Sequence, residues 1–480
     1  MWLELKAESG LPLNRQIYER VKALILSGGL AAGEKLPSSR AFSKELGVAR
    51  NTVLEAYEQL LAEGYLEARR GSGTTVAGGI AASALSARPT QIAVAASSSK
   101  TADGRVINFR SGMPDMDVFP RKEWGRLYQR VCEALPASAF RYCEPAGVWE
   151  LREALSAYLF RVRGIRAMPE RIMITSGSTQ GLRLVSQLLR RENSLVLVED
   201  PVHRGLVEVV ARAGHTVRGI RADASGMDCA ALPAGLEAGQ PVAFVYVTPS
   251  HQYPLGGILP VQRRQTLIRF AHETECFIVE DDYDSEFRYE GPPVSSLYEL
   301  APDTVIYLGS FSKILAPAIR LGFAIIPEGM LAAWRPEKMY TDVHTDALSQ
   351  HTLAAFINSG GLERHTWKMK KLYKRKREHM MRCLSQNFGG HVEIRGQAAG
   401  LHLVAGFPGV AFTENVVGEL YARGLKVVPV ESYSLCRDGA HAHEVILGYA
   451  HLSEAEMSRG AAILRDCCRQ CGKSLDFLRR

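Results

Sequence analysis

The sequence predicts an α/β protein built from a small N-terminal unit and a much larger body with a mostly parallel sheet. Residues 12–76 contain three amphipathic helical stretches, followed by two short strands around a Gly-Ser-Gly turn. Residues 78–105 are rich in Ala, Ser and Gly without a sustained period, which is typical of a flexible linker. Beyond them, short apolar stretches expected to be strands alternate with helical stretches, a pattern that favours parallel strands. The expected strands include "RIMITSG", "SLVLVED", "VAFVYVTP", "CFIVEDD" and "TVIYLGS". We therefore expect domains at 1–77 and 106–480, joined by a linker at 78–105.

Length, composition and charge limit the class of protein. The chain has 480 residues, 46% apolar and 23% charged, as in globular proteins with more than one domain. No apolar run reaches the roughly 18 residues of a membrane span, and the N-terminus does not look like a signal peptide. We therefore expect a cytoplasmic protein without membrane contact. The nine cysteines fit reduced thiols, and because Cys468 and Cys471 have no further ligands at matching spacing, no metal site is expected. The net charge of +7 permits nucleic acid binding without requiring it.

The N-terminal unit begins with a helix expected over residues 12–28, which carries apolar residues at helical spacing. After a turn, Ser38 or Ser39 can cap a short helix that Gly47 ends. A third helix follows and ends at Gly64. The inward residues expected in the first and third helices are Ile17, Val21, Leu24, Ile25, Val53, Tyr57, Leu60 and Leu61.

Two short helices joined by a tight turn suit a helix-turn-helix, whose second helix enters the major groove of DNA. Its N-terminal residues are Arg50, Asn51 and Thr52, and Arg and Asn are the types that pair bidentately with guanine and adenine. Arg40, in the preceding helix, is placed to meet phosphate. The hairpin adds a basic tip whose glycines permit close approach to a DNA backbone, formed by Arg69, Arg70, Gly71 and Gly73. The alternative is a protein-binding helical module with a solvated basic face.

Three stretches of the body carry polar residues where strands or turns end. Lys313 in "SFSK" follows the strand "TVIYLG", and a lysine that forms a Schiff base needs a confined pocket that suppresses its charge. Ser178 and Thr179 in "TSGSTQG" open a helix whose first N–H groups can bind phosphate. The stretch "VEDDYDSEF" places acids and Tyr283 at a strand end. Near Lys313, the residues that suit a phosphate ester are Ser310, Ser312 and Arg320.

The N-terminal stretch resembles the GntR-type winged helix through "LPSSRAFSKELGVARNTV" and "AYEQLLAEGYLEARRGSGTTV", at the spacing of that domain. This resemblance implies a DNA-binding domain. One residue departs from the pattern, because Ala49 stands where such domains often have Ser or Thr before the recognition helix. Loss of that capping hydroxyl typically costs about 1 kcal/mol of helix stability, unless Asn51 replaces it.

Residues 106 to about 470 resemble the fold-type I aminotransferases, through the stretches above and "FRYCEPAGVWELREALSAYL", "TPSHQYPLGG" and "GLERHTWKMKKLYKRKREHM". The resemblance implies a large domain with a mostly parallel sheet, a small C-terminal α+β subdomain and pyridoxal 5'-phosphate (PLP) as cofactor. Lys313 would form the Schiff base with PLP. Asp281, with Asp282 as a rival, would pair with the pyridine nitrogen, and Tyr283 would bond to the phenolic oxygen. The residues implied around the phosphate are Ser178, Thr179, Ser310, Ser312, Arg320 and, from the neighbouring subunit of a homodimer, Tyr142.

Two residues depart from the aminotransferase pattern. His203 in "VEDPVHRG" stands where a Tyr usually stacks on the cofactor ring, and an imidazole can stack as well. Ile446 in "EVILGYA" stands where catalytic relatives have an Arg that clamps a substrate carboxylate, so Arg110, His251 or another basic group would have to compensate. The basic run 368–377 is expected to be a solvated helix face, with a second DNA contact as the alternative.

The order of winged helix, linker and aminotransferase-like body resembles the MocR/GabR-type bacterial transcription regulators over essentially the whole chain. This resemblance implies a PLP-dependent regulator that binds double-stranded DNA at promoter half-sites and senses an effector, either an amino compound or PLP itself. One alternative is a catalytically active aminotransferase with an accessory DNA-binding domain, against which Ile446 speaks. Whether a transaminase half-reaction remains is open. Another alternative is a PLP-binding or structural dimer with a non-functional N-terminal head.

Overall fold

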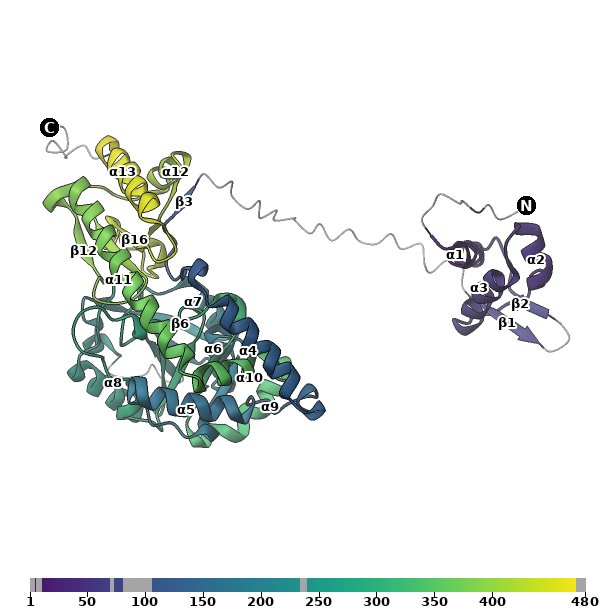
Figure 1. Cartoon of the computed structure of the whole chain (residues 1–480), viewed down its shortest axis with the longest axis horizontal. Coiled ribbons are helices and arrows are strands. Elements are labelled where there is room, and N and C mark those ends of the chain that lie inside the picture. The colour runs from purple at the N-terminus through teal and green to yellow at the C-terminus, as the bar shows by residue number, and fades with distance from the viewer. Residues whose placement is uncertain (1–4, 6–10, 70–72, 81–105, 234–239, 472–480) are drawn as a thin grey trace. The chain divides into compact units, whose positions relative to one another are not determined.

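The computed structural model describes residues 5, 11–69, 73–80, 106–233 and 240–471 (Figure 1). The chain divides into two compact units, Met1–Ser99 and Lys100–Arg480. Most of the predicted linker 78–105 falls outside the described residues, so the proposed boundaries at 77 and 106 stay predictions. Among the described helices, none has the length and apolar character that crossing a membrane requires.

The N-terminal unit consists of helices followed by a two-stranded antiparallel hairpin, as predicted. Its elements are α1 (Leu13–Leu26), α2 (Ser39–Leu46), α3 (Arg50–Ala62), β1 (Leu66–Arg69) and β2 (Gly73–Val76). The Ser38 hydroxyl accepts a hydrogen bond from the Ala41 N–H at 3.2 Å and caps α2, and Gly47 ends the helix with a φ of +67°. The unit has its own core, which includes Ile17, Val21, Phe42, Val53, Leu60, Leu66 and Val76.

An eight-stranded sheet forms the centre of the body, in the order β4-β11-β10-β9-β8-β5-β6-β7. Its strands are β4 (Ile172–Thr175), β5 (Leu195–Asp200), β6 (Thr216–Asp223), β7 (Gly226–Met227), β8 (Val242–Val247), β9 (Phe277–Asp282), β10 (Val305–Ser310) and β11 (Gly322–Ile325). The pairs from β10 through β6 are parallel, whereas β11 runs antiparallel to both β4 and β10. The prediction of a mostly parallel sheet is therefore confirmed.

Helices cover both faces of this sheet. They are α4 (Arg121–Ala134), α5 (Trp149–Arg163), α6 (Ser178–Leu188), α7 (Arg204–Arg212), α8 (Val261–Glu273), α9 (Leu331–Asp342) and α10 (Ala347–Asn358). One buried cluster joins α5, α8 and α10 to side chains such as Ile174 and Ile278. A second cluster joins α6, α7 and α9 to Met173 and Val279. Neighbouring strand residues thus enter opposite cores, as the alternation of side chains along a strand requires.

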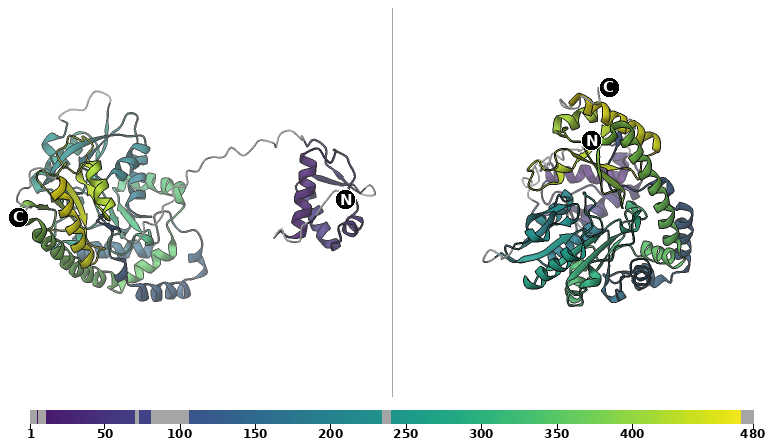
Figure 2. Two further views of the ribbon diagram at one scale, coloured as in Figure 1. Left: turned by 90° about the horizontal axis from the view of Figure 1, so that it is seen from above. Right: turned by 90° about the vertical axis from the view of Figure 1, so that its left-hand side faces the viewer.

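A smaller α+β subdomain completes the body (Figures 1 and 2). It contains α11 (Gly361–Phe388), β12 (Glu393–Arg395), β13 (His402–Gly406), α12 (Glu414–Ala422), β14 (Leu425–Lys426), β15 (Val428–Pro429), β16 (Glu444–Gly448) and α13 (Glu454–Cys471). Its antiparallel sheet has the order β12-β13-β16-β15. The first strand of the body, β3 (Ile107–Asn108), pairs in parallel with β14 and so belongs to this subdomain. The predicted small C-terminal subdomain is confirmed.

The basic run 368–377 lies in α11, and the expectation of a solvated face holds for only part of it. Met369 and Tyr373 are buried, as expected. However, Lys376 and Arg377 are buried too, because Lys376 bonds to Asp115 and Arg377 to Glu290, each at 2.7 Å. These two basic groups tie α11 to Asp115 and Glu290 and are not free to meet DNA.

Candidate functional site

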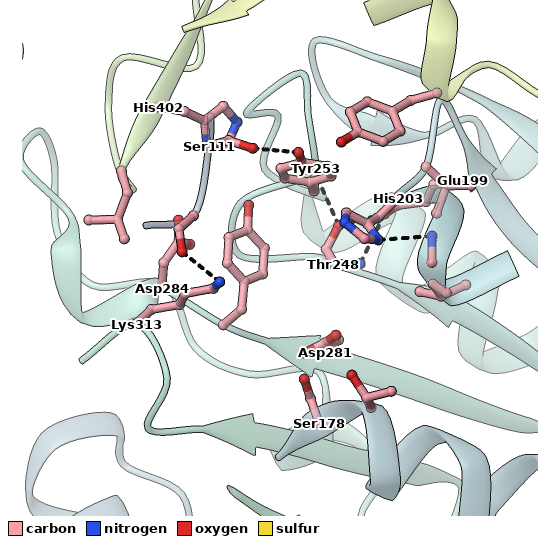
Figure 3. Close-up of a pocket in the computed structure, with 18 of the residues that line it drawn as sticks. Ser111, Ser178, Glu199, His203, Thr248, Tyr253, Asp281, Asp284, Lys313 and His402 are labelled. Carbon is pink, nitrogen blue, oxygen red and sulfur yellow. Dashed lines mark hydrogen bonds between the residues drawn. The ribbon is translucent and has the colours of Figure 1, made fainter. Parts of the chain in front are cut away.

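A cavity of about 410 Å³ opens at the carboxyl ends of β5, β8 and β9 (Figure 3). Crevices at the carboxyl ends of parallel strands are where α/β proteins bind their ligands. Side chains from the large sheet, from the segment 110–113 and from the small subdomain line it together. They include Arg110, Ser178, Thr179, His203, Tyr246, Tyr253, Asp281, Tyr283, Lys313, His402 and Tyr433.

Lys313 enters the cavity from the turn that follows β10, as the sequence predicts. Its Nζ donates a hydrogen bond to the Gly112 carbonyl oxygen at 2.6 Å. Gly112 has a φ of +68°, and a Cβ built there would lie 3.0 Å from this Nζ. Burial lowers the pKa of Lys313, and the Arg110 charge adds to that lowering although Asp284 opposes it. A lysine with a lowered pKa is suited to attack a carbonyl group as the neutral amine.

Asp281 and Asp282 face opposite sides of β9. Asp281 lines the cavity and accepts a hydrogen bond from the Tyr246 hydroxyl at 2.6 Å. Its other oxygen, Oδ1, is buried and has no hydrogen-bond partner among the described residues. Burial raises the pKa of Asp281 to about 6. Asp282 instead accepts from Arg163 and from the Tyr307 hydroxyl, each at 2.6 Å, on the side away from the cavity.

Tyr283 lines the cavity, as Lys313 does, and is hydrogen-bonded to His251. Its hydroxyl donates to the His251 carbonyl oxygen at 3.0 Å and lies 3.1 Å from the His251 Nδ1. The same Nδ1 is 3.1 Å from both oxygens of Asp284. Burial acts to lower the pKa of His251, but the Asp284 carboxylate outweighs it and the pKa is raised. His251 is therefore engaged with Asp284.

His203 caps α7 and presents its ring to the cavity (Figure 3). Its Nδ1 accepts from the Gly205 N–H at 3.1 Å, and its ring stacks on Tyr433 with centroids 5.6 Å apart. Desolvation by the cavity walls lowers the pKa of His203, and the charges of Lys313 and Arg110 lower it further. A neutral flat ring therefore stands at the position where the sequence predicts stacking on a cofactor.

Of the residues predicted to surround a phosphate, Ser178, Thr179 and Arg320 lie at the turn that precedes α6. Ser178 and Thr179 begin this helix and line the cavity. The Arg320 guanidinium donates to the Ser176 carbonyl oxygen and lies 3.3 Å from a Cβ built on Gly177. The Ser312 N–H donates to the Ser310 hydroxyl at 3.2 Å. Of the predicted phosphate set, the cavity lining as described includes Ser178 and Thr179 but not Ser310, Ser312 or Arg320.

Tyr142 does not line the cavity of its own chain, as far as the described residues go. It is 85% exposed, with its ring 5.9 Å from that of His344. Its predicted contact is with a neighbouring subunit, and that role stays a prediction.

Several polar residues of the cavity were not predicted from the sequence. The Glu199 Oε2 accepts from the Thr248 N–H at 3.0 Å and from the Thr248 hydroxyl at 2.6 Å. Burial raises the pKa of Glu199 to about 7, and its Oε1 has no partner within the described part of the chain. Tyr246, which holds Asp281, is a further such residue. Its position at the end of a buried apolar strand is the one sequence signal that could have indicated it.

On the N-terminal unit, the residues predicted to read DNA begin α3. Arg50 and Asn51 are exposed and Thr52 is half-buried, while Arg40 is exposed on α2. Ala49 is the N-cap of α3 without a side-chain hydrogen bond, and no bond from Asn51 replaces it among those described. Of the residues predicted at the basic tip, Arg69 and Gly73 lie in the hairpin strands. Arg70 and Gly71 lie outside the described residues.

Lys35 is a basic residue of this unit that the sequence did not single out. It bridges to Thr75 beside β2, and its Cε would lie 2.8 Å from a Cβ built on Gly73. The Lys35 side chain therefore lies against the hairpin next to the predicted basic tip. Lys35 lies in the loop before α2, outside the helical patterns of the sequence, so no pattern indicates that it contacts DNA.

The two units together define a class of protein in which a winged helix-turn-helix is joined to an aminotransferase-like domain. Residues 13–76 match the family described as bacterial regulatory proteins, gntR family, and residues 105–464 match aminotransferase class I and II. The chain belongs to the aminotransferase class I and II family through its body and to the MocR-type GntR regulators as a whole. The predicted family and fold class are thereby confirmed.

Two relatives cover nearly the whole chain. It is 31% identical over 480 residues to the probable rhizopine catabolism regulatory protein MocR of Rhizobium meliloti, covering 96% of this chain and 95% of that one. It is 33% identical over 420 residues to the HTH-type pyridoxine biosynthesis transcriptional regulator PdxR of Corynebacterium glutamicum, covering 87% and 88%. The prediction of a DNA-binding transcription regulator with an aminotransferase-like domain is confirmed, and the alternative of an aminotransferase with an accessory domain is not favoured.

The body is similar to solved aminotransferases. An archaeal alanine:glyoxylate aminotransferase superposes with a TM-score of 0.71 at 27% identity, covering 76% of this chain and 91% of that one. The α-aminoadipate aminotransferase LysN of Thermus thermophilus, complexed with N-(5'-phosphopyridoxyl)-L-leucine, superposes with a TM-score of 0.69 at 27% identity, covering 77% and 93%. These folds carry PLP chemistry, which makes PLP the cofactor to test against this cavity.

Proposed function

We propose that the cavity of the body holds PLP and that its occupancy by an effector changes how the N-terminal unit binds promoter DNA. The observation that carries this proposal is the buried, unpartnered Oδ1 of Asp281 within the described cavity. A buried polar atom without a partner is costly, and a protonated pyridine nitrogen would satisfy it. When bound, PLP supplies an aldehyde that condenses with primary amines.

The other residues fit the same group. Lys313 offers an amine with a lowered pKa, and the Tyr283 hydroxyl, in the lining of the same cavity, would bond to a phenolic oxygen. The neutral His203 ring offers a stacking surface. The α6 N-terminus with Ser178 and Thr179 offers hydroxyls and N–H groups to a phosphate. We also assign Arg320, which is bonded to the turn that precedes α6, to this phosphate, together with Ser310 and Ser312.

A homodimer is part of the proposal. The Tyr142 ring lies against His344, just beyond α9. Large apolar side chains close to these two residues in the sequence are exposed, namely Phe140, Trp149, Met339 and Tyr340. Exposed apolar side chains that gather on one surface mark protein interaction sites. In a dimer, Tyr142 of one subunit would reach the phosphate of its partner, and two copies of α3 would read two half-sites. The DNA-binding role supports a cytoplasmic location.

The effector in this proposal is an amino compound or PLP itself. An effector with higher affinity for one of two arrangements shifts the protein toward it, and a coupling of about 1–3 kcal/mol changes DNA affinity roughly 5–150-fold. We propose residues 78–105 as the linker that permits this rearrangement.

The proposal is tested with the full-length chain loaded with PLP. Borohydride reduction followed by digestion and mass spectrometry should find the PLP adduct on Lys313. Lys313→Ala should lose both the adduct and the visible cofactor absorbance, whereas the exposed control Lys374→Ala keeps them. Binding to the chain's own promoter region, titrated with PLP and with amines, should change in the wild type. An adduct on another lysine, or promoter binding that ignores both ligands, contradicts the proposal.

A further inference from the structure

The position where the resemblance to aminotransferases places a carboxylate-clamping arginine is apolar and buried in this chain. Ile446 in β16 is 1% exposed and packs with Leu255, Val404 and Val430. Its cross-strand neighbours in the small sheet, Val404 and Val428, are apolar as well. A charge inside this cluster would lose its water without gaining a partner. An anion therefore has to be received by another element.

The backbone at Arg110 lies against the same strand, two residues further along. The Gly448 N–H donates to the Phe109 carbonyl oxygen at 2.9 Å. A Cβ built on Gly448 would come within 2.1 Å of the Arg110 carbonyl oxygen, so this close approach requires glycine. Residues two apart in a strand share a face. Arg110 is thus held next to the face of β16 that carries Ile446.

The Arg110 guanidinium is a cation without a protein anion in the described structure. It is exposed, it lines the cavity, and no ion pair or side-chain hydrogen bond engages it within the described ranges. The positive charge of Arg110 acts on other groups in the cavity. Burial lowers the pKa of Lys313 and of His203, and the Arg110 charge contributes to the lowering in both.

The other basic side chains around the cavity are already engaged or neutral. His251 is held by Asp284 at 3.1 Å. The Nε2 of His402 lies 3.0 Å from the Pro254 carbonyl oxygen, and burial with the nearby His251 lowers the pKa of His402 to about 3, so that it carries no charge at neutral pH. Among the described residues, Arg110 is therefore the group best placed to receive an anion.

We infer that Arg110 receives an anionic group of the effector, so that the effector is a primary amine that also carries a carboxylate or an equivalent anion. This inference rests on the proposed function and narrows the effector to one chemical class. A guanidinium presents a planar fork that binds a carboxylate through two parallel hydrogen bonds. Because the Lys313 amine bonds to the Gly112 carbonyl oxygen, two residues after Arg110, one small molecule can reach both groups.

The test compares amines that differ in one carboxylate, using full-length chain loaded with PLP. The probes are L-alanine against ethylamine, and 5-aminopentanoate against pentylamine, titrated by calorimetry and by the visible cofactor absorbance. In the wild type, at least one carboxylate-bearing amine should bind more tightly than its partner. Arg110→Gln should reduce that preference roughly tenfold to hundredfold, since hydrogen bonds to charged groups contribute about 1.5–3 kcal/mol. Arg110→Lys should retain part of it.

Two controls keep the outcomes separate. Arg459→Gln removes an exposed arginine of α13 outside the cavity lining and should leave every affinity unchanged. Cofactor content and thermal unfolding of Arg110→Gln should match the wild type. An unchanged carboxylate preference in Arg110→Gln overturns the inference, as does loss of PLP from that variant, which would assign Arg110 to the cofactor. Failure of the proposed function is recognised independently, by absence of the visible cofactor absorbance in the wild type.

Discussion

Asp281 and Asp282 are neighbours in the sequence, yet Asp281 lines the cavity whereas Asp282 forms a buried ion pair with Arg163. Strand alternation turns one carboxylate into the cavity and the other toward Arg163, where the side chains of both ion-pair partners are almost fully buried. The acidic string alone left both open as partners of a cofactor nitrogen. Their places at the end of β9, where Asp281 is aligned with Leu308 and Asp282 with Gly309, put them on opposite faces of the sheet.

Substitution of the two aspartates should give opposite phenotypes. Asp281→Asn removes the charge facing the cavity, and we expect PLP affinity to fall roughly ten- to hundredfold with little change in stability. Asp282→Asn leaves Arg163 buried without its partner, and we expect a loss of about 3–5 kcal/mol in the free energy of unfolding. PLP titration and denaturant unfolding measure the two effects. Equal effects of both variants on PLP affinity would contradict this assignment.

Glu199 should make the stability of the folded chain depend on pH. Burial raises its pKa from 4.5 to about 7 in the folded chain. Between these values the folded state holds a proton that the unfolded state has lost, so stability falls as pH rises through this window, by on the order of 3 kcal/mol. Glu199→Gln should remove this decline and unfold at higher temperature than the wild type above pH 7. Unfolding is compared for both proteins across the window, and parallel curves would show that Glu199 does not titrate there.

Arg50 and Lys35 should affect DNA binding in different ways. Arg50 begins α3, and Arg50→Ala should cost about 1–3 kcal/mol at one base position and relax the sequence preference there. Lys35 lies beside the hairpin, and Lys35→Ala should weaken binding to all sequences and reduce the salt dependence by about one charge. Fluorescence anisotropy on operator variants at several salt concentrations distinguishes them. If Arg50→Ala weakens every sequence equally, Arg50 contacts phosphate.

At the scale of elements, α2 and α3 differ in how they begin. The Ser38 hydroxyl caps α2, whereas Ala49 leaves the first N–H groups of α3 without a side-chain acceptor. Ser38→Ala should destabilise its helix and Ala49→Ser should stabilise α3, each by about 1 kcal/mol, because Ala49 already has the extended backbone of an N-cap. Hydrogen exchange of the helix amides in the full chain measures both. Unchanged α3 protection in Ala49→Ser would show that the missing side-chain cap does not limit the stability of this helix.

The elements that the sequence predicted are those with a local signal. The strands β4, β5, β8, β9 and β10 are buried apolar runs, and each was predicted. The strand β6 is half-exposed and β11 begins with a glycine, a residue depleted in strands, so neither stands out. The same limit applies to the cavity. Lys313, Asp281 and Ser178 lie in recognisable strings, whereas the Tyr246 bond to Asp281 joins two strands that meet only in the folded sheet.

At the scale of the whole molecule, the N-terminal unit has its own core and should read DNA by itself. In the proposed dimer, two such units share one linked assembly, and linkage can raise affinity 10²–10⁴-fold without new contacts, as an order-of-magnitude expectation. We therefore expect the full chain to bind a two-half-site promoter far more tightly than residues 1–77 do, and only the full chain to respond to an effector. Anisotropy titrations compare the two, and equal affinities would contradict dimeric reading.

The pairing of β3 with β14 determines which part of the body the N-terminal unit is attached to. Since Ile107 is aligned with Leu425, the chain enters the body through the small subdomain and not through the eight-stranded sheet. If ligand binding rotates the small subdomain relative to the eight-stranded sheet, the attachment point of the DNA-binding unit rotates with it. A rotation that closes the subdomain over the cavity would then move this attachment point directly, and no chain of contacts through the large sheet would be needed to transmit the motion.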